Sequence, residues 1–139
     1  MIDIYFDDVM KVEQLDPDGK KFDKVSRIVA KSEKSGAEML LDVNTSIYQI
    51  LVGDKLRMAL TTSLNGSIDS EGNQISLADK FEYVMHGLLY KMSDEISGGQ
   101  AKVLVYISFG GLQLMLKGDP ILMGKFKVDQ NLFLLIRKI

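Results

Sequence analysis

Hydrophobic and polar residues alternate along most of the chain with a period of two residues. Apolar side chains occupy every second position in runs at residues 2–6, 39–43, 56–60, 81–89, 101–109, 112–116 and 132–136. Alternation of this kind is typical of β-strands that bury one face. The pattern therefore predicts an all-β chain with seven to nine short strands.

Turn-forming residues separate these runs. Glycine, proline and small polar residues gather at 16–19, 53–54, 65–67, 97–99 and 117–120, and such clusters favour tight turns. Short strands at this spacing are typical of a sandwich or an antiparallel barrel. We favour a closed barrel of about eight strands, because two runs are apolar on both faces. Gly87 and Gly110 also fall inside strand patterns, where a missing side chain relieves crowding at a sharp bend.

One segment lacks the alternation. Residues 65–78 hold few apolar side chains and many small polar ones, which predicts an exposed, mobile loop. No linker, internal repeat or low-complexity tract divides the chain. We therefore expect the 139 residues to form a single β-barrel domain spanning 1–139, which is long enough to bury a core.

Composition narrows the class of protein. The net charge is −2 and 46% of the residues are hydrophobic, values that are ordinary for a soluble globular domain. The absence of cysteine excludes disulfides and thiolate metal sites. The acidic start of the chain does not resemble a signal peptide, and the longest wholly apolar run, 132–136, is too short to span a bilayer. We expect a soluble intracellular protein.

Residues that carry catalysis or bind metals are scarce. His86 is the only histidine and lies within a strand pattern, so we interpret it as an ordinary surface or core residue. Asp16 begins a segment that resembles a calcium loop, but lysines stand where a ligand and the required glycine belong. No nucleophile elbow, phosphate-binding loop or dinucleotide fingerprint is present. We therefore predict no catalytic residue, no metal site and no cofactor.

A basic stretch is the main candidate for contact with nucleic acid. Residues 20–34 contain six basic and two acidic side chains, a local balance of +4, and such a stripe is able to contact several phosphates. Phe22 is its only aromatic residue, whereas binding of single strands usually relies on aromatic platforms. The simpler interpretation is an edge strand whose lysines prevent pairing with other chains.

The segment FGGLQLML at 109–116 is the main candidate for contact with another protein. At Gly110 and Gly111 the missing side chains would let a partner backbone approach closely, and Leu112, Leu114 and Met115 would supply apolar contacts. A bend in the barrel explains the glycines equally well. From the residues alone we expect a soluble β-barrel that acts as a binding module.

Several segments together resemble a known family. They are DPDGKKFDKVSRI at 16–28, LDVN at 41–44, SLADKFEYVMHG at 76–87, VYISFGGLQLMLKGD at 105–119 and the ending LFLLIRKI at 132–139. In order and in sequence they are similar to the small barrel subunit common to eukaryotic nuclear RNA polymerases I, II and III. The combination is far more specific than any of its parts.

The resemblance implies an antiparallel, oligonucleotide-binding-like barrel that is not itself catalytic, needs no cofactor and has no membrane role. Such a subunit docks on the outside of the polymerase core, chiefly against the largest subunit near its pore. It supports assembly and stability of the enzyme in the nucleus, in both nucleolus and nucleoplasm. For partner binding the resemblance favours six residues around the paired glycines: Phe109, Gly110, Gly111, Leu112, Leu114 and Lys117.

The family also implies weak, non-specific binding of single-stranded DNA by a stretch that matches residues 16–40. This stretch overlaps the basic segment and makes five residues the nucleic-acid candidates: Lys20, Lys21, Lys24, Arg27 and Lys31. With six basic and five acidic residues, the wider stretch has a net charge of only +1. The alternative function is thus a stand-alone barrel that binds single-stranded nucleic acid.

Overall fold

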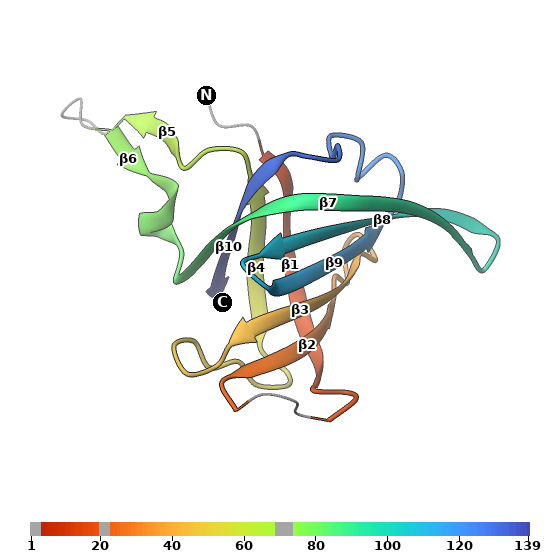
Figure 1. The fold of residues 1–139 in the computed structure, drawn as a ribbon, viewed down its shortest axis with the longest axis horizontal. Helices are drawn as coiled ribbons and strands as arrows, with labels where there is room; N and C mark the ends of the chain where they lie inside the picture. The colour runs from red at the N-terminus through yellow and green to blue at the C-terminus, as the bar shows by residue number, and fades with distance from the viewer. Residues whose placement is uncertain (1–3, 20–22, 69–73) are drawn as a thin grey trace.

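The computed structural model describes residues 4–19, 23–68 and 74–139, and its regular secondary structure is almost entirely β-strand (Figure 1). The strands are β1 (Ile4–Leu15), β2 (Val25–Lys31), β3 (Glu38–Asn44), β4 (Lys55–Thr61), β5 (Asn65–Ile68), β6 (Gln74–Ser76), β7 (Tyr83–Ser97), β8 (Gln100–Phe109), β9 (Leu112–Gly118) and β10 (Asn131–Lys138). A short 3-10 helix, η1 (Leu77–Lys80), precedes β7.

Eight of these strands form a closed barrel in the order β1-β2-β3-β9-β8-β7-β10-β4, and pairing of β4 with β1 completes the ring. All neighbouring strands in the ring are antiparallel. The predicted all-β antiparallel barrel of about eight strands is confirmed. The interpretation of the basic stretch as an edge strand is wrong, because β2 pairs with both β1 and β3. A pattern of exposed lysines reports which face meets solvent, not how many neighbours a strand has.

Alternate side chains of the barrel strands point inward and fill the barrel. On β3, for example, Met39, Leu41 and Val43 are buried. The largest fully buried side chains on the ring strands are Met10, Ile28, Met39, Leu41, Leu56, Met58, Leu60, Leu89, Ile107, Leu114 and Leu116, and Ile50 joins them from the segment between β3 and β4. The barrel interior is therefore the hydrophobic core of the protein, and contact with another molecule is left to its outer surface.

Gly110 and Gly111 form the two-residue turn between β8 and β9. Phe109 pairs with Leu112 across the turn, and the glycines have φ angles of +63° and +102°. A two-residue hairpin turn with positive φ at both positions is of type I′, which glycine adopts without strain. The expectation that Gly110 lies within a bent strand is therefore wrong. The same kind of turn joins β7 to β8 at residues 98–99.

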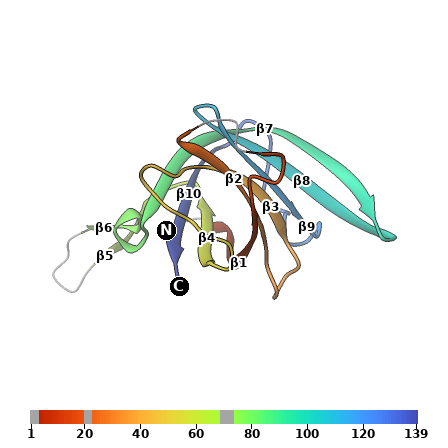
Figure 2. The ribbon, with the colours of Figure 1, turned by 90° about the horizontal axis from the view of Figure 1, so that it is seen from below.

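The segment at 65–78 is not the irregular loop that its composition predicts. Its ends pair as the separate two-stranded sheet β5–β6, and η1 follows directly. Figures 1 and 2 show this hairpin off to one side of the barrel. Residues 69–73, on which part of the expected mobility falls, lie outside the described residues.

β7 passes so close to β8 that a side chain does not fit at Gly87. A Cβ atom there would lie 2.3 Å from the Ser108 carbonyl oxygen and 2.6 Å from Cδ1 of Phe109. The expectation that this glycine relieves crowding within a strand is confirmed. Close contact at this point lets β7 follow the curve of the barrel between β8 and β10.

Gly87→Ala is expected to lower the free energy of unfolding by roughly 1–3 kcal/mol, because the methyl group would overlap a backbone oxygen that cannot rotate away. Gly124→Ala is the matched control, since its Cβ would lie 3.4 Å from the nearest atom, the Ile121 carbonyl oxygen, an ordinary contact. Urea unfolding of the two variants measures the difference. Equal midpoints would contradict the close approach of β7 to β8.

Candidate protein interface

The outward face of β7 is apolar although the barrel interior is already filled. Tyr83 and Leu89 point inward and are buried, whereas Val84, Leu88 and Tyr90 are 36%, 41% and 40% exposed. The sequence pattern of this run indicated two apolar faces, and the structure places one in the core and the other at the surface. Clustered apolar side chains at a surface are typical of sites that bind other proteins.

Aromatic side chains lie beside this stripe. His86 stacks on Phe133 of β10 with ring centroids 4.3 Å apart, and Tyr90 lies 6.3 Å from Tyr106 of β8. The Tyr90 hydroxyl donates a hydrogen bond of 2.8 Å to Oε1 of Gln113. Tyrosine rings held in place in this way are common in protein interfaces, because they bury large area at little cost in side-chain entropy.

A cross-strand row extends the apolar surface around the barrel. Val29 of β2 lies opposite Leu40 of β3. Leu40 in turn lies opposite Met115 of β9, which lies opposite Tyr106 of β8. All four side chains are half-buried. On β7 the row ends at Lys91, whose Nζ lies 5.2 Å from the centre of the Tyr106 ring. The four side chains of the row and the stripe on β7 are here named the outer apolar face: Val29, Leu40, Met115, Tyr106, Val84, Leu88 and Tyr90.

Charged side chains border the outer apolar face and pair among themselves. On one side Arg27 of β2 forms a double ion pair with Asp42 of β3, from Nε to Oδ1 at 2.8 Å and from Nη2 to Oδ2 at 3.2 Å. On the other side Lys117 of β9 pairs with Glu95 of β7, and the hydrogen bond between them raises the pKa of Lys117. An apolar centre with a polar rim is the usual arrangement of a protein interface.

Asp42 connects three strands at the border of this face. Besides the guanidinium of Arg27, Asp42 Oδ2 accepts the backbone N–H of Gln113 on β9 at 3.1 Å. Its side chain is only 12% exposed, and its hydrogen bond to Arg27 raises the pKa of that guanidinium. Sequence reasoning missed Asp42. The signal was an acidic residue placed between Leu41 and Val43, two positions of the core pattern.

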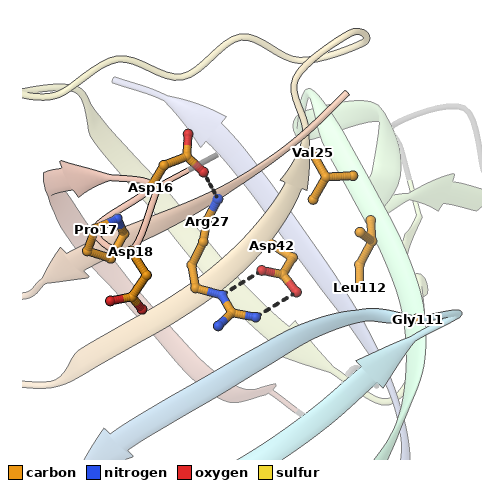
Figure 3. Close-up of a pocket in the computed structure, with 9 residues that line it drawn as sticks. Asp16, Pro17, Asp18, Val25, Arg27, Asp42, Gly111 and Leu112 are labelled. Carbon is orange, nitrogen blue, oxygen red and sulfur yellow. Dashed lines mark hydrogen bonds and ion pairs between the residues drawn. The ribbon is translucent and has the colours of Figure 1, made fainter. Parts of the chain in front are cut away.

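A pocket of about 290 Å³ opens beside the Arg27–Asp42 pair (Figure 3). Oδ1 of Asp16 accepts the backbone N–H of Arg27 at 3.0 Å, which holds the turn at 16–19 against β2. The pocket therefore brings together residues from both sites that the sequence predicted, the basic stretch and the glycine turn. Its lining consists of Asp16, Pro17, Asp18, Gly19, Val25, Arg27, Asp42, Gly111 and Leu112.

The six residues expected to bind a partner all lie on the β8–β9 hairpin. The turn at 110–111 is exposed, and Leu112 is half-buried beside the pocket. Phe109 and Leu114 are 6% and 1% exposed, so their side chains belong to the barrel core. Lys117 is half-buried and held by its ion pair. Partner binding by this hairpin stays a prediction. Of the six residues, Gly110 and Gly111 are exposed and therefore accessible to a partner.

The five nucleic-acid candidates differ in their surroundings, and two of them cannot be described. Lys20 and Lys21 lie outside the described residues, and Lys24 is exposed ahead of β2. Arg27 is engaged by Asp42, while Nζ of Lys31 lies 4.0 Å from Glu38. Arg27 and Lys31 sit at opposite borders of the outer apolar face. Binding of single-stranded DNA by these residues stays a prediction.

Among the residues that the structure describes, no group of three or more histidine, cysteine, aspartate or glutamate side chains is placed to hold a metal ion. In the same ranges, no helix is long and apolar enough to cross a membrane.

The fold and this surface define a class of protein, a small closed β-barrel that is filled by its own core and presents an apolar face outward. A family model described as RNA polymerase Rpb8 matches residues 7–138. The chain therefore belongs to the RNA polymerase Rpb8 family, and the resemblance found in its sequence motifs is confirmed.

Curated relatives match the chain from end to end. "DNA-directed RNA polymerases II, IV and V subunit 8B" of Arabidopsis thaliana is 50% identical over 142 residues, covering 98% of this chain and 97% of the relative. "DNA-directed RNA polymerases I, II, and III subunit rpabc3" of Dictyostelium discoideum is 44% identical over 144 residues, covering 99% of each chain. The corresponding subunit RPABC3 of Saccharomyces cerevisiae is 33% identical over 152 residues, covering 99% and 100%.

Asp42→Ala is expected to lower the free energy of unfolding by about 1–2 kcal/mol, since it leaves the Arg27 guanidinium and a backbone N–H without their acceptor while solvent screens part of the loss. Asp7→Ala is the control, because Asp7 pairs with Arg57 by the same double contact but outside this site. Its expected cost is below about 1 kcal/mol. Chemical denaturation of both variants checks the order; a larger loss for Asp7→Ala would contradict the central role of Asp42.

Proposed function

We propose that this chain is a non-catalytic subunit shared by the nuclear DNA-directed RNA polymerases I, II and III, and that it supports the assembly and stability of those enzymes. One observation carries the proposal: similarity over the full length. The family model spans residues 7–138, and relatives named as subunits of polymerases I, II and III match 99% of the chain.

The proposed partner is the largest polymerase subunit, bound from outside together with the rest of the polymerase core. Two features support a contact through the surface described above. The barrel interior is filled, so that binding must use the exterior, and the outer apolar face exposes Leu88 and Tyr90 next to the β8–β9 hairpin. Removing such side chains from water drives association, while the paired charges at the rim fix orientation. The proposed location is the nucleus, in both nucleolus and nucleoplasm.

The decisive experiment is purification of the tagged chain from cells of its own organism, with identification of every chain that accompanies it. We expect a stoichiometric set of large polymerase subunits. Recovery of the chain alone at gentle salt would contradict the proposal and would favour the stand-alone barrel that binds single-stranded nucleic acid.

Leu88→Glu is expected to reduce the amount of polymerase recovered with the tagged chain by roughly tenfold, because a charge at the centre of an apolar contact must be desolvated without a partner. Val128→Glu is the matched control, since Val128 is 47% exposed, close to the 41% of Leu88, and lies outside the outer apolar face. Both variants should unfold at the midpoint of the wild type. If the two substitutions reduce recovery equally, the outer apolar face is not the contact.

Gly110→Asn tests whether the β8–β9 turn touches the partner. Asparagine tolerates the φ of +63° found at Gly110, so the isolated barrel should keep its stability while a larger turn disturbs a close contact. Gly98→Asn makes the same change at the equivalent position of the β7–β8 turn, where φ is +57° and open space surrounds the glycine. We expect lower polymerase recovery for Gly110→Asn only. Unchanged recovery would limit Gly110 to its role in turning the chain.

A further inference from the structure

A row of lysines crosses the outside of the barrel on β2, β1 and β4. Lys31 of β2 lies opposite Lys11 of β1, and Lys11 lies opposite Lys55 of β4. All three side chains are exposed, because the next residue along each strand, such as Val12 or Leu56, is the one that enters the core. These three residues are named here the lysine row.

The lysine row is unfavourable for the barrel by itself. Residues directly opposite one another on neighbouring strands lie about 5 Å apart at their Cα atoms, and like charges in that arrangement destabilise a sheet. Glu38 offsets part of the repulsion at Lys31, because its Oε1 lies 4.0 Å from the lysine Nζ. Among the described residues, no ion pair or hydrogen bond engages the side chain of Lys11 or Lys55. Within the part of the chain that the structure describes, Lys11 and Lys55 therefore have no paired anion that would offset the repulsion.

The lysine row borders a hollow of about 260 Å³ whose charged lining is net positive. Lys34 joins the row from the β2–β3 turn, and two acids, Asp8 and Glu33, face the same space. Oδ2 of Asp8 already accepts the hydroxyls of Ser32 and Ser35, at 2.7 and 2.6 Å. Four lysines against two carboxylates leave a balance of +2, and hydroxyl groups already occupy one oxygen of Asp8.

The remaining lining favours a protein segment over a nucleic acid strand. Val9, 39% exposed, lies among the lysines, and Val52, 58% exposed, lines an adjoining hollow of about 560 Å³ that shares Lys11 with the first. None of the described residues that line the two hollows is aromatic, so a base would have no ring among them on which to stack. Glu13 and Glu33 would repel a continuous phosphate backbone, whereas a peptide with separate acids and apolar residues between them meets no such conflict.

We propose that the lysine row is a docking site for an acidic segment of another protein in the polymerase, an inference that rests on the proposed function. In the ring of strands β1 stands opposite β8. The lysine row, centred on β1, therefore faces away from the part of the outer apolar face that β8 carries. The two surfaces adjoin at Lys31 of β2 and spread apart from there, so the barrel contacts one part of the enzyme by charge over β1 and β4 and another by apolar surface over β8 and β7.

The test compares lysine reactivity in the isolated chain and in the purified polymerase. Both samples are treated with an amine-acetylating reagent, and a second portion of the polymerase is joined by carbodiimide, which links amines directly to carboxylates. We expect Lys11 and Lys55 to be protected several-fold in the complex and cross-linked to aspartate or glutamate of another chain. Lys127 is the control, since it is exposed and remote from the row.

Each other outcome overturns the inference in a recognisable way. Full reactivity of Lys11 and Lys55 in a polymerase that has been recovered intact means that no segment covers the row. Protection that disappears after nuclease treatment assigns the row to nucleic acid instead. Failure to recover any polymerase contradicts the proposed function, a separate result.

Lys11→Glu gives two readouts of opposite sign. The new carboxylate lies between Lys31 and Lys55 and replaces repulsion by attraction, so the urea midpoint of the isolated barrel should rise. The same change should make the subunit leave the immobilised polymerase at lower salt than the wild type. Lys127→Glu changes the net charge by the same amount and should alter neither the urea midpoint nor the salt concentration at which the subunit leaves the polymerase. A variant that is more stable but bound as firmly as the wild type would show that the lysine row does not dock.

Discussion

Pairing of β4 with β1 is the contact on which the rest of the structure depends, because it converts a curved sheet into a closed ring. Closure divides the side chains of the ring strands into two sets. One set meets in the middle and forms the core, and the other is directed outward whatever its chemistry. A barrel of eight strands is just small enough to be filled by its own side chains, and here Met10, Leu60 and Leu116 are among those that fill it. Function therefore belongs to the outer surface.

The outer surface is ordered by the same register that closes the ring. Antiparallel pairing places residues of neighbouring strands side by side, so that rows of like chemistry run around the barrel. The row from Val29 to Tyr106 is apolar, the row through Arg27 and Asp42 is a neutral ion pair, and the lysine row is cationic. Asp42 fixes the register beside the apolar row, since its carboxylate accepts hydrogen bonds from the Arg27 guanidinium on β2 and from the backbone N–H of Gln113 on β9.

Alternation made most of the fold predictable, because a period of two follows directly from one buried face and needs no knowledge of neighbours. The turn at 110–111 was misjudged for a physical reason. Glycine fits both a bent strand and a hairpin turn, and only a shift of phase between the runs 101–109 and 112–116 separates the two. Phe109 and Leu112, three residues apart, lie opposite one another on the same face of the hairpin. The prediction of a loop at 65–78 was wrong for a different reason. β5 and β6 pair with each other and not with the barrel, and a short hairpin outside the core needs no strong apolar pattern.

The candidate site was only partly accessible to sequence reasoning. The second apolar face of β7 can be found within one run, because Val84, Leu88 and Tyr90 alternate with residues that face the barrel interior. The lysine row was missed, because Lys11, Lys31 and Lys55 come from separate strands and only the register places them together. The basic stretch at 20–34 looked like one site, yet Arg27 and Lys31 are separated by Val29 on the folded surface and pair with different acids.

A filled barrel also limits what kind of subunit this is. Protein interiors packed at crystal-like density transmit displacement and resist deformation, so two surfaces on such a barrel keep a fixed separation and orientation. A subunit that acts as proposed, by holding its neighbours at a set distance, needs no moving part. The contribution of such a subunit is the difference in stability between the assembly that contains it and the assembly that lacks it. That is why its informative measurements are the recovery and salt resistance of the assembly.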